Sequence, residues 1–477
     1  MKNLMYKGFA SMALLAVALS ACGNATPQVV VNTVVVKETS VVKETQVVES
    51  TKIVNQQTVV TATPAPTANP YNDQAPIVVW IDAARKPMMD LWIKTHPDQA
   101  KLVKYEIVDR GQFASKVLLF NNSGSGWPDV VFAEPSIVMD VADAAHDYPG
   151  DLTPWVDPAI IKQFVPGALD PCYTPDKKLL CLRNDLAPNV LYYDKIQMDK
   201  FGYKVPTTWE EYQALGDKVA QEHPGYVLGT ADNEPTFYMW ASGCPVAHPL
   251  SLSEVVINAE DPKCVRVAQM IDHMVANGSL SNLGPFDPKY IALGNQNKIL
   301  MMVCAAWCGD YVYNGTYYKT GTSQVSEGRL GVALPLKWQS DDKAYTGNWG
   351  GAAWMVSKHT QNPKLAVSIA VYMTTDIDVT QIVGTMPAYG PAADAWAKKL
   401  DSNKLYAFNP FPIFKQAAGM VNPEFTDVVR YDLIQGFKPF LTAVEQKKPT
   451  VDTLKDVQST LVDLAQKQGY DVKTSMP

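Results

Sequence analysis

Strand-like and helix-like segments alternate from residue 76 onward, and this alternation limits the chain to a small group of folds. By apolar periodicity and length, strands are expected at 76–81, 103–108 and 128–133, and helices at 86–95 and 113–121. The order strand, helix, strand, helix, strand predicts a mainly parallel sheet with helices on both faces. Ligands of such sheets bind at the carboxyl ends of the strands, where Trp80, Asp82 and Glu134 lie.

The length of the chain indicates more than one lobe. About 400 residues follow residue 76, and a single hydrophobic core stops growing at about 250–300 residues. The chain carries 41 basic and 48 acidic residues and shows no basic cluster, which argues against a nucleic-acid partner. Loss of Lys2 and Lys7 with a cleaved leader would lower its net charge from -7 to -9.

The first 22 residues have the pattern of a bacterial lipoprotein leader. Lys2 and Lys7 precede an apolar run at residues 9–19, which is too short to span a bilayer and is typical of a secretory signal. The run ends in Leu-Ser-Ala-Cys, which resembles the lipobox, and residues 1–21 are therefore predicted to be removed and Cys22 to be lipidated. The expected location is the cell surface or the periplasm, with the chain anchored to the membrane. An ordinary cleaved signal followed by a coincidental cysteine is the alternative.

Six cysteines remain after Cys22, and thiols outside the cell tend to form disulfides. About fifteen pairings of six cysteines exist, and we favour near neighbours. The favoured pairs are Cys172 with Cys181, Cys244 with Cys264, and Cys304 with Cys308. The motif CAAWC has three residues between its cysteines, whereas the thioredoxin motif has two. The chain has no HExxH motif or paired CxxC spacing, so no metal site is expected.

A repetitive segment, residues 22–75, separates Cys22 from the body. Pairs of β-branched residues recur every six positions from Val29-Val30 to Val59-Val60. Six residues return to the same side of an extended chain but not of a helix, so the repeat favours extended structure over a coiled coil. The Pro- and Thr-containing stretch TATPAPTANP follows as a linker. The segment is interpreted as a disordered tether or as a self-associating β-type stalk, and both keep the body away from the membrane.

Several motifs occur in the order found in one protein family. They are IVVWID, PDVVFAE, LAPNVLYYDK, PTTWEEY, KILMMVCAAWCGDY, RLGVALPLKW, GNWGGAAWMV and GTMPAYGPAAD. With this order and spacing, the chain from residue 76 resembles the extracellular carbohydrate-binding proteins of ABC transporters related to maltose-binding protein. The resemblance implies an α/β periplasmic-binding-protein fold of two lobes, each a mainly parallel sheet flanked by helices, with the ligand cleft between them. The expected lobes are 76–186 with 330–374, and 187–329 with 375–477.

The resemblance also implies a function in binding and transport, without catalysis. A sugar or oligosaccharide would be captured between the lobes and delivered to the transmembrane subunits of an ABC permease by a monomeric body that needs no cofactor. In this family an aromatic residue after the strand equivalent to KILMMVCAAW lies against the sugar, which points to Trp307. An indole suits the C–H face of a pyranose, and a disulfide between Cys304 and Cys308 would hold it in place. The alternative is that Trp307 is a core residue.

Further residues are candidates for the same cleft. Gly350 belongs to a glycine-rich stretch in which a ligand could approach the backbone closely. Carboxylates can accept paired hydrogen bonds from sugar hydroxyls. The remaining aromatic and acidic candidates are Trp80, Tyr238, Trp240, Trp349, Tyr389, Asp82, Glu134 and Asp310.

Three other functions are weighed against sugar binding. Asp82 and Glu134 could be the two acids of a surface glycoside hydrolase, although no hydrolase motif is present and NSGSGWP is not GxSxG. A polyamine or another small cationic solute could bind acids placed between aromatic residues on the same fold. The doublets Tyr192-Tyr193 and Tyr317-Tyr318 suggest a ferric site, but adjacent residues of a strand point to opposite faces.

Overall fold

The computed structural model describes residues 34–36, 52–54 and 71–475, with gaps at 144, 175, 233–235, 252, 319–326, 383 and 423–428. The chain divides into two compact units, Met1–Pro70 and Tyr71–Pro477. In the first unit, β1 (Val34–Val36) pairs antiparallel with β2 (Lys52–Val54), and both lie in the six-residue repeat. The leader, Cys22 and the rest of the repeat lie outside the described residues. Among the residues described, no helix is long and apolar enough to cross a bilayer.

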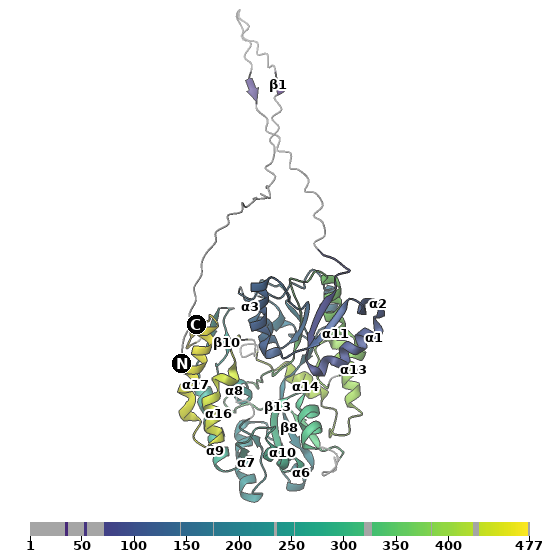
Figure 1. Cartoon of the computed structure of the whole chain (residues 1–477). Coiled ribbons are helices and arrows are strands. Elements are labelled where there is room, and N and C mark those ends of the chain that lie inside the picture. Colours follow the sequence, from purple (N-terminus) through teal and green to yellow (C-terminus); the bar gives the residue numbers. More distant parts are fainter. Residues whose placement is uncertain are drawn as a thin grey trace, which may run out of the picture. The chain divides into compact units, whose positions relative to one another are not determined.

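The second unit, here called the body, contains both strands and helices (Figure 1). Its strands are β3 (Ile77–Ile81), β4 (Val103–Ile107), β5 (Val130–Ala133), β6 (Cys181–Arg183), β7 (Asp185–Leu186), β8 (Asn189–Asp194), β9 (Gly229–Thr230), β10 (His248–Pro249), β11 (Glu254–Val256), β12 (Leu280–Ser281), β13 (Met301–Ala305), β14 (Leu330–Ala333), β15 (Ala353–Val356), β16 (Met386–Pro387) and β17 (Asp471–Lys473). Its α-helices are α1 (Lys86–Thr95), α2 (Pro97–Ala100), α3 (Phe113–Ser123), α4 (Pro135–Asp140), α5 (Pro158–Ile161), α6 (Lys195–Phe201), α7 (Trp209–Glu222), α8 (Thr236–Ser242), α9 (Pro262–Ala276), α10 (Pro288–Asn295), α11 (Pro363–Thr375), α12 (Ile377–Thr380), α13 (Gly390–Leu400), α14 (Phe411–Ala418), α15 (Leu433–Gly436), α16 (Lys438–Glu445) and α17 (Leu454–Lys467). The 3₁₀ helices are η1 (Ala83–Arg85), η2 (Arg110–Gln112), η3 (Asp170–Cys172) and η5 (Val451–Thr453), and η4 (Gly309–Tyr317) is a π-helix.

The first lobe is built on a five-stranded sheet of order β4-β3-β5-β15-β6. Strand β3 pairs parallel with β4 and β5, whereas β15 is antiparallel to β5 and β6. Strands β3 and β5 read as continuous apolar runs because helices cover both faces of the sheet. The alternation predicted for residues 76–133 is therefore confirmed, whereas the sheet of this lobe is mixed, with two parallel and two antiparallel pairings.

The second lobe is built on a three-stranded sheet of order β13-β8-β14, and here the prediction of a mainly parallel sheet is wrong. Strand β8 is central and pairs antiparallel with both neighbours. It starts at Asn189, directly after the chain leaves the first lobe, whereas β13 ends at Ala305 opposite that same residue. Because β8 runs away from the first lobe and β13 returns toward it, the residues after β13 are delivered to the boundary between the lobes.

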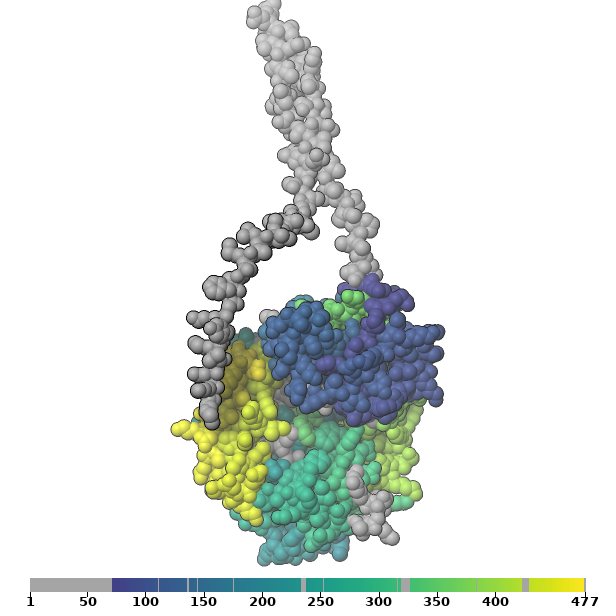
Figure 2. Space-filling model, viewed as in Figure 1, coloured from purple at the N-terminus to yellow at the C-terminus, as the bar shows by residue number. Residues whose placement is uncertain are grey.

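The lobe boundaries differ from those expected. Strand β14 was expected in the first lobe, but its residues pair with β8, so the chain crosses back only between β14 and β15. The expected change of lobe at 374 is also too early, because α11 and α12 pack against elements of the first lobe. After α12 the chain reaches β16, which pairs with β7 next to the segment where the chain first passes from one lobe to the other. In Figure 2 the purple and blue residues form one end of the body and the teal residues the other, which shows the two lobes.

Local sequence signals explain several elements. The Thr208 hydroxyl accepts the Glu211 N–H at 3.2 Å and the Glu211 carboxylate accepts the Thr208 N–H at 3.3 Å, so the motif PTTWEEY forms a capping box at the start of α7. The three near-neighbour disulfides are all formed, with Cα–Cα distances of 5.0, 4.8 and 6.1 Å in chain order. All six of these cysteines are buried, so the three crosslinks belong to the interior of the lobes.

Candidate ligand-binding site

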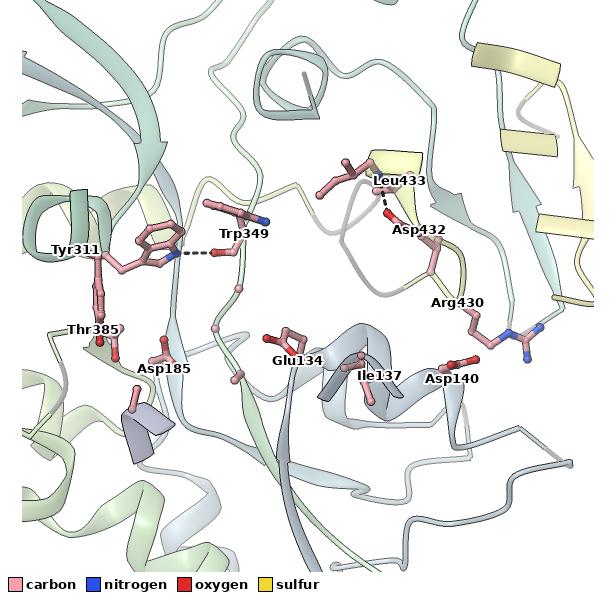
Figure 3. Close-up of a pocket in the computed structure, with 18 of the residues that line it drawn as sticks. Glu134, Ile137, Asp140, Asp185, Tyr311, Trp349, Thr385, Arg430, Asp432 and Leu433 are labelled. Atoms are coloured by element: carbon pink, nitrogen blue, oxygen red, sulfur yellow. Dashed lines mark hydrogen bonds between the residues drawn. The ribbon is translucent and has the colours of Figure 1, made fainter. Parts of the chain in front are cut away.

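A cleft of about 780 Å³ lies between the two lobes. Its walls come from the strand ends of the first lobe, from the turn after β13 and the segment before α15 in the second lobe, and from the crossing segment between β14 and β15. The volume falls in the upper part of the range of about 300–1,000 Å³ that is usual for small-molecule sites. Figure 3 shows Tyr311 and Trp349 at one end of the cleft, Asp140, Arg430 and Asp432 at the other, and Glu134 between them.

Two tryptophans form an aromatic wall at one end of the cleft. The rings of Trp307 and Trp349 lie 4.7 Å apart at 43°, and the Trp307 Nε1–H donates to the Trp349 carbonyl at 3.1 Å. Tyr311 packs edge-on against Trp307 with ring centroids 6.2 Å apart and is 43% exposed. Both tryptophans are only partly buried, so this wall presents flat aromatic surface to the cleft.

Trp307 is held by the turn that follows β13. The disulfide between Cys304 and Cys308 closes this turn, and η4 begins at Gly309. The buried Tyr192 hydroxyl donates to the Ala306 carbonyl at 2.8 Å and accepts the Gly309 N–H at 3.3 Å. The expected strand, turn and disulfide are therefore confirmed, and the turn is anchored to the central strand of its lobe.

Carboxylates and two arginines supply the polar part of the cleft. Glu134 follows β5, Asp140 ends α4, and Asp185 lies in β7 beside the crossing. Burial raises the pKa of the Asp140 carboxyl above its ordinary value, while nearby His146 and Arg430 act in the opposite direction. Such carboxylates can accept hydrogen bonds from neutral ligands or pair with cationic ones.

The two arginines of the cleft already interact with other groups of the protein. Arg85 forms an ion pair with Asp82 at 3.3 Å, and its guanidinium lies 4.1 Å from the centre of the Phe132 ring. Arg430 donates to the Gln468 carbonyl at 2.9 Å and lies 4.5 Å over the Tyr470 ring. Both guanidinium groups are therefore held by the protein at the edge of the cleft.

Half of the predicted ligand-binding residues line the cleft. These are Glu134, Trp240, Trp307, Trp349 and Gly350. The side chains of Tyr238 and Trp240 illustrate why only part of the set comes together. They are two positions apart in α8, so they point to nearly opposite sides of the helix. Tyr238 therefore points into the core, where its hydroxyl donates to the Thr230 carbonyl at 3.0 Å.

The other predicted residues lie outside the cleft. Trp80 packs under α3 against Phe113 and Phe120 and donates to Glu106, because its position in β3 points it at the helix. Asp82 caps η1 and pairs with Arg85, and it does not line the cleft beside Glu134. Tyr389 precedes α13 and packs on Phe164, and Asp310 lies in a separate cavity of about 420 Å³ beside Asn314 and Lys399. Burial raises the pKa of the Asp310 carboxyl.

The tyrosine doublets take part in packing. Tyr192 and Tyr317 are fully buried, and the Tyr317 hydroxyl donates to the Pro285 carbonyl at 3.0 Å. Tyr318 is also buried, beside Tyr313. The hydroxyls of Tyr192 and Tyr317 are therefore committed to backbone carbonyls.

Sequence reasoning missed several lining residues. Tyr311 stands four positions after Trp307, a spacing that places two side chains on one face at a helix start, so it could have been predicted. Asp140 is the last residue of α4, the helix that begins directly after Glu134, so its position in the cleft could be predicted only once α4 was known. The segment 429–434 comes from the distant C-terminal part of the chain, and no local signal connects it to the cleft.

Comparison with known proteins agrees with this architecture. A model of the bacterial extracellular solute-binding protein family matches residues 99–407. The arabinooligosaccharide-binding protein of Halalkalibacterium halodurans is 20% identical over 337 residues, which cover 68% of this chain and 72% of that protein.

Two solved structures share the fold at low sequence identity. One is the galacto-N-biose-/lacto-N-biose I-binding protein of an ABC transporter from Bifidobacterium longum in complex with lacto-N-biose, with 19% identity and a TM-score of 0.65, covering 84% of this chain and 99% of that one. The other is an ABC transporter associated binding protein from B. animalis subsp. lactis in complex with β-1,6-galactobiose, with 18% identity and a TM-score of 0.65, covering 84% of this chain and 100% of that one. Because the family match spans well over half of the 477 residues, the chain belongs to the bacterial extracellular solute-binding protein family.

Proposed function

We propose that this protein captures an oligosaccharide in the cleft between its lobes and delivers it to the permease of an ABC importer. The observation that carries the proposal is the aromatic wall of Trp307 and Trp349, placed in the same cleft as the carboxylates of Glu134 and Asp185. A pyranose has one face of C–H groups and a rim of hydroxyls. Flat indoles match the face, and carboxylate oxygens accept from the rim.

The known relatives support a sugar as the ligand. By their names or descriptions they bind an arabinooligosaccharide, lacto-N-biose and β-1,6-galactobiose. A cleft of about 780 Å³ also supports an oligosaccharide rather than a single sugar unit, because it lies in the upper part of the usual range of about 300–1,000 Å³.

The proposal includes an anchor and a membrane partner. Membership of an extracellular family supports a location at the cell surface or in the periplasm. We infer that residues 1–21 are removed, that Cys22 carries the lipid anchor, and that residues 22–75 act as a spacer. The loaded body is monomeric and presents both lobes to the transmembrane subunits of the permease.

A thermal-shift screen of the mature protein tests the ligand class. The panel contains arabino-, galacto- and malto-oligosaccharides, their monosaccharides, and the polyamines spermidine and putrescine. A matching oligosaccharide at a hundredfold excess over Kd should add about 2.7 kcal/mol of stability. Sugar recovered afterwards should be intact, because the protein binds without cleaving.

Two outcomes would contradict the proposal. A response to polyamines with none to sugars would favour a cationic solute, the alternative suggested by the acidic residues Glu134, Asp140 and Asp185 in the cleft. Release of shorter sugars would favour a hydrolase.

A further inference from the structure

We propose that Asn348 is a positioning residue of the ligand cleft, in which its side-chain amide fixes the segment that carries Trp349 and Gly350. The proposal deepens the function proposed above and rests on it, since it concerns how the aromatic wall is held for the ligand. Asn348 itself is 8% exposed and lies behind the residues that line the cleft.

The amide of Asn348 connects the two segments by which the chain passes between the lobes. Its Oδ1 accepts the Ala187 N–H at 2.9 Å, and its Nδ2 donates to the Gly350 carbonyl at 2.8 Å. Ala187 belongs to the first crossing, between β6 and β8, and Gly350 to the second, between β14 and β15. One side chain therefore holds both crossings together through an acceptor and a donor.

The backbone of Trp349 is held by hydrogen bonds on two sides. Its N–H donates to the Ala187 carbonyl at 3.0 Å, and its own carbonyl accepts the Trp307 Nε1–H at 3.1 Å. The backbone of Trp349 thus joins the first crossing on one side and the indole of Trp307 on the other. A shift of the Asn348 amide would move Trp349 and, with it, the angle between the two indoles.

The residues that follow cannot hold the segment by side chains. Gly350 and Gly351 have φ angles of +88° and +73°, in the left-handed region that favours glycine. A Cβ on Gly351 would lie 2.3 Å from the Arg183 guanidinium, so this position has no room for a side chain. Arg183 also donates to the Gly350 carbonyl, at a longer 3.4 Å. Asn348 therefore makes the shorter of these two side-chain bonds to the Gly350 carbonyl.

Only an amide of this length satisfies both partners. Aspartate keeps an acceptor for the Ala187 N–H but loses the donor to the Gly350 carbonyl, and leucine has a similar shape but loses both. Ala187 is fully buried, so its N–H would lack a partner in the leucine variant. Leucine removes both bonds, whereas aspartate keeps one but places a buried carboxylate oxygen against the Gly350 carbonyl, so both variants should disturb the segment.

Asn362 provides a matched control. It is 1% exposed, its Oδ1 accepts the Leu365 N–H at 3.2 Å, and its Nδ2 donates to the Ala75 carbonyl at 3.1 Å. It therefore makes the same kinds of bonds as Asn348, but it caps α11 and does not line or adjoin the cleft. Asn362→Asp should lower the melting temperature and leave ligand affinity unchanged.

The experiment compares Asn348→Asp, Asn348→Leu and Asn362→Asp with the wild type. Three quantities are measured on folded protein: the melting temperature, Kd for an oligosaccharide that the wild type binds, and the tryptophan exciton signal in circular dichroism without ligand. Asn348→Leu and Asn348→Asp should each raise Kd about tenfold, the low end of what loss of an outer-shell partner costs at metal sites. Both should change the exciton signal of the Trp307–Trp349 pair.

The outcomes separate positioning from general stability. If the Asn348 variants melt earlier but keep the wild-type Kd and exciton signal, as expected for Asn362→Asp, the proposal is overturned. If Asn348→Leu does not fold, Asn348→Asp gives the same test while keeping the bond from the Ala187 N–H. If the wild type binds no oligosaccharide, the proposed function fails, while the exciton signal still tests whether Asn348 positions the tryptophan pair.

Discussion

Replacing Trp307 with alanine tests whether the aromatic wall serves the ligand or the fold. In the free protein the change removes one hydrogen bond, from Nε1 to the Trp349 carbonyl, and the ring contacts with Trp349 and Tyr311. The bond contributes about 1 kcal/mol net, and each ring contact about 0.5 kcal/mol, the low end of the usual range because the rings are partly exposed. We therefore expect unfolding to become easier by roughly 2 kcal/mol, less than the ~3–5 kcal/mol typical of a buried tryptophan.

The expected loss of ligand affinity is at least as large. An aromatic residue that stacks on a bound ligand is typically a hot spot, with about 2 kcal/mol or more lost on truncation, or about 30-fold in Kd. Denaturant unfolding of the free protein gives the first quantity, and calorimetric titration with an oligosaccharide gives the second.

Two other tryptophans serve as controls. Trp155 is 40% exposed and contacts Tyr71 outside the cleft, so Trp155→Ala should leave Kd unchanged. Trp354 is fully buried in β15, so Trp354→Ala should cost about 3–5 kcal/mol of stability, with normal affinity in the folded fraction. If Trp307→Ala behaves like Trp354→Ala, melting early but binding normally when folded, the reasoning about the aromatic wall is refuted.

Three further predictions concern the cysteines and a partly buried acid. Replacing Cys304 and Cys308 with serine should raise Kd by only a few-fold and cost about 2 kcal/mol or less, because the closed loop is short; an unchanged Kd would contradict this. Cys22→Ser should move the protein from the membrane fraction to the medium or to a retained precursor, and unchanged fractionation would disprove the anchor. Burial and two neighbouring carboxylates raise the pKa of Asp232 from 3.8 to about 6, so its ionisation should lower stability as pH rises from 3.8 to about 6. Asp232→Asn should then add about 1 kcal/mol at pH 7, a value reduced for its partial exposure, and nothing below pH 3.8; equal effects at both pH values in thermal unfolding would contradict this.

Much of the first lobe and of the disulfide pattern could be predicted because the signals are local. Strands β3, β4 and β5 and the helices between them follow from apolar periodicity over short windows. The three disulfides join the nearest cysteines in sequence. The direction of pairing in the second lobe depends on where β8 enters and β13 returns, which short windows do not contain.

The candidate site was predicted only in part for a similar reason. Residue type and strand-end position selected both Trp80 and Glu134, yet only Glu134 lines the cleft, because the pleat of β3 turns Trp80 toward α3. Asp310 and Tyr311 are neighbours in η4 that point in different directions, and the cleft receives Tyr311. Asp432 reaches the cleft through the packing of α15 on α17, a contact between parts of the chain that the motifs do not relate.

Small-angle X-ray scattering during titration with an oligosaccharide tests most directly the claim that the ligand is held between the lobes. The cleft is lined by both lobes, so a ligand that contacts both walls should draw them together. We predict that the radius of gyration of the mature protein falls as an oligosaccharide from the screen is added and saturates at one ligand per chain, with the midpoint set by the calorimetric Kd. A radius of gyration that stays constant through saturation with every sugar, or that falls only with a polyamine, would contradict the account.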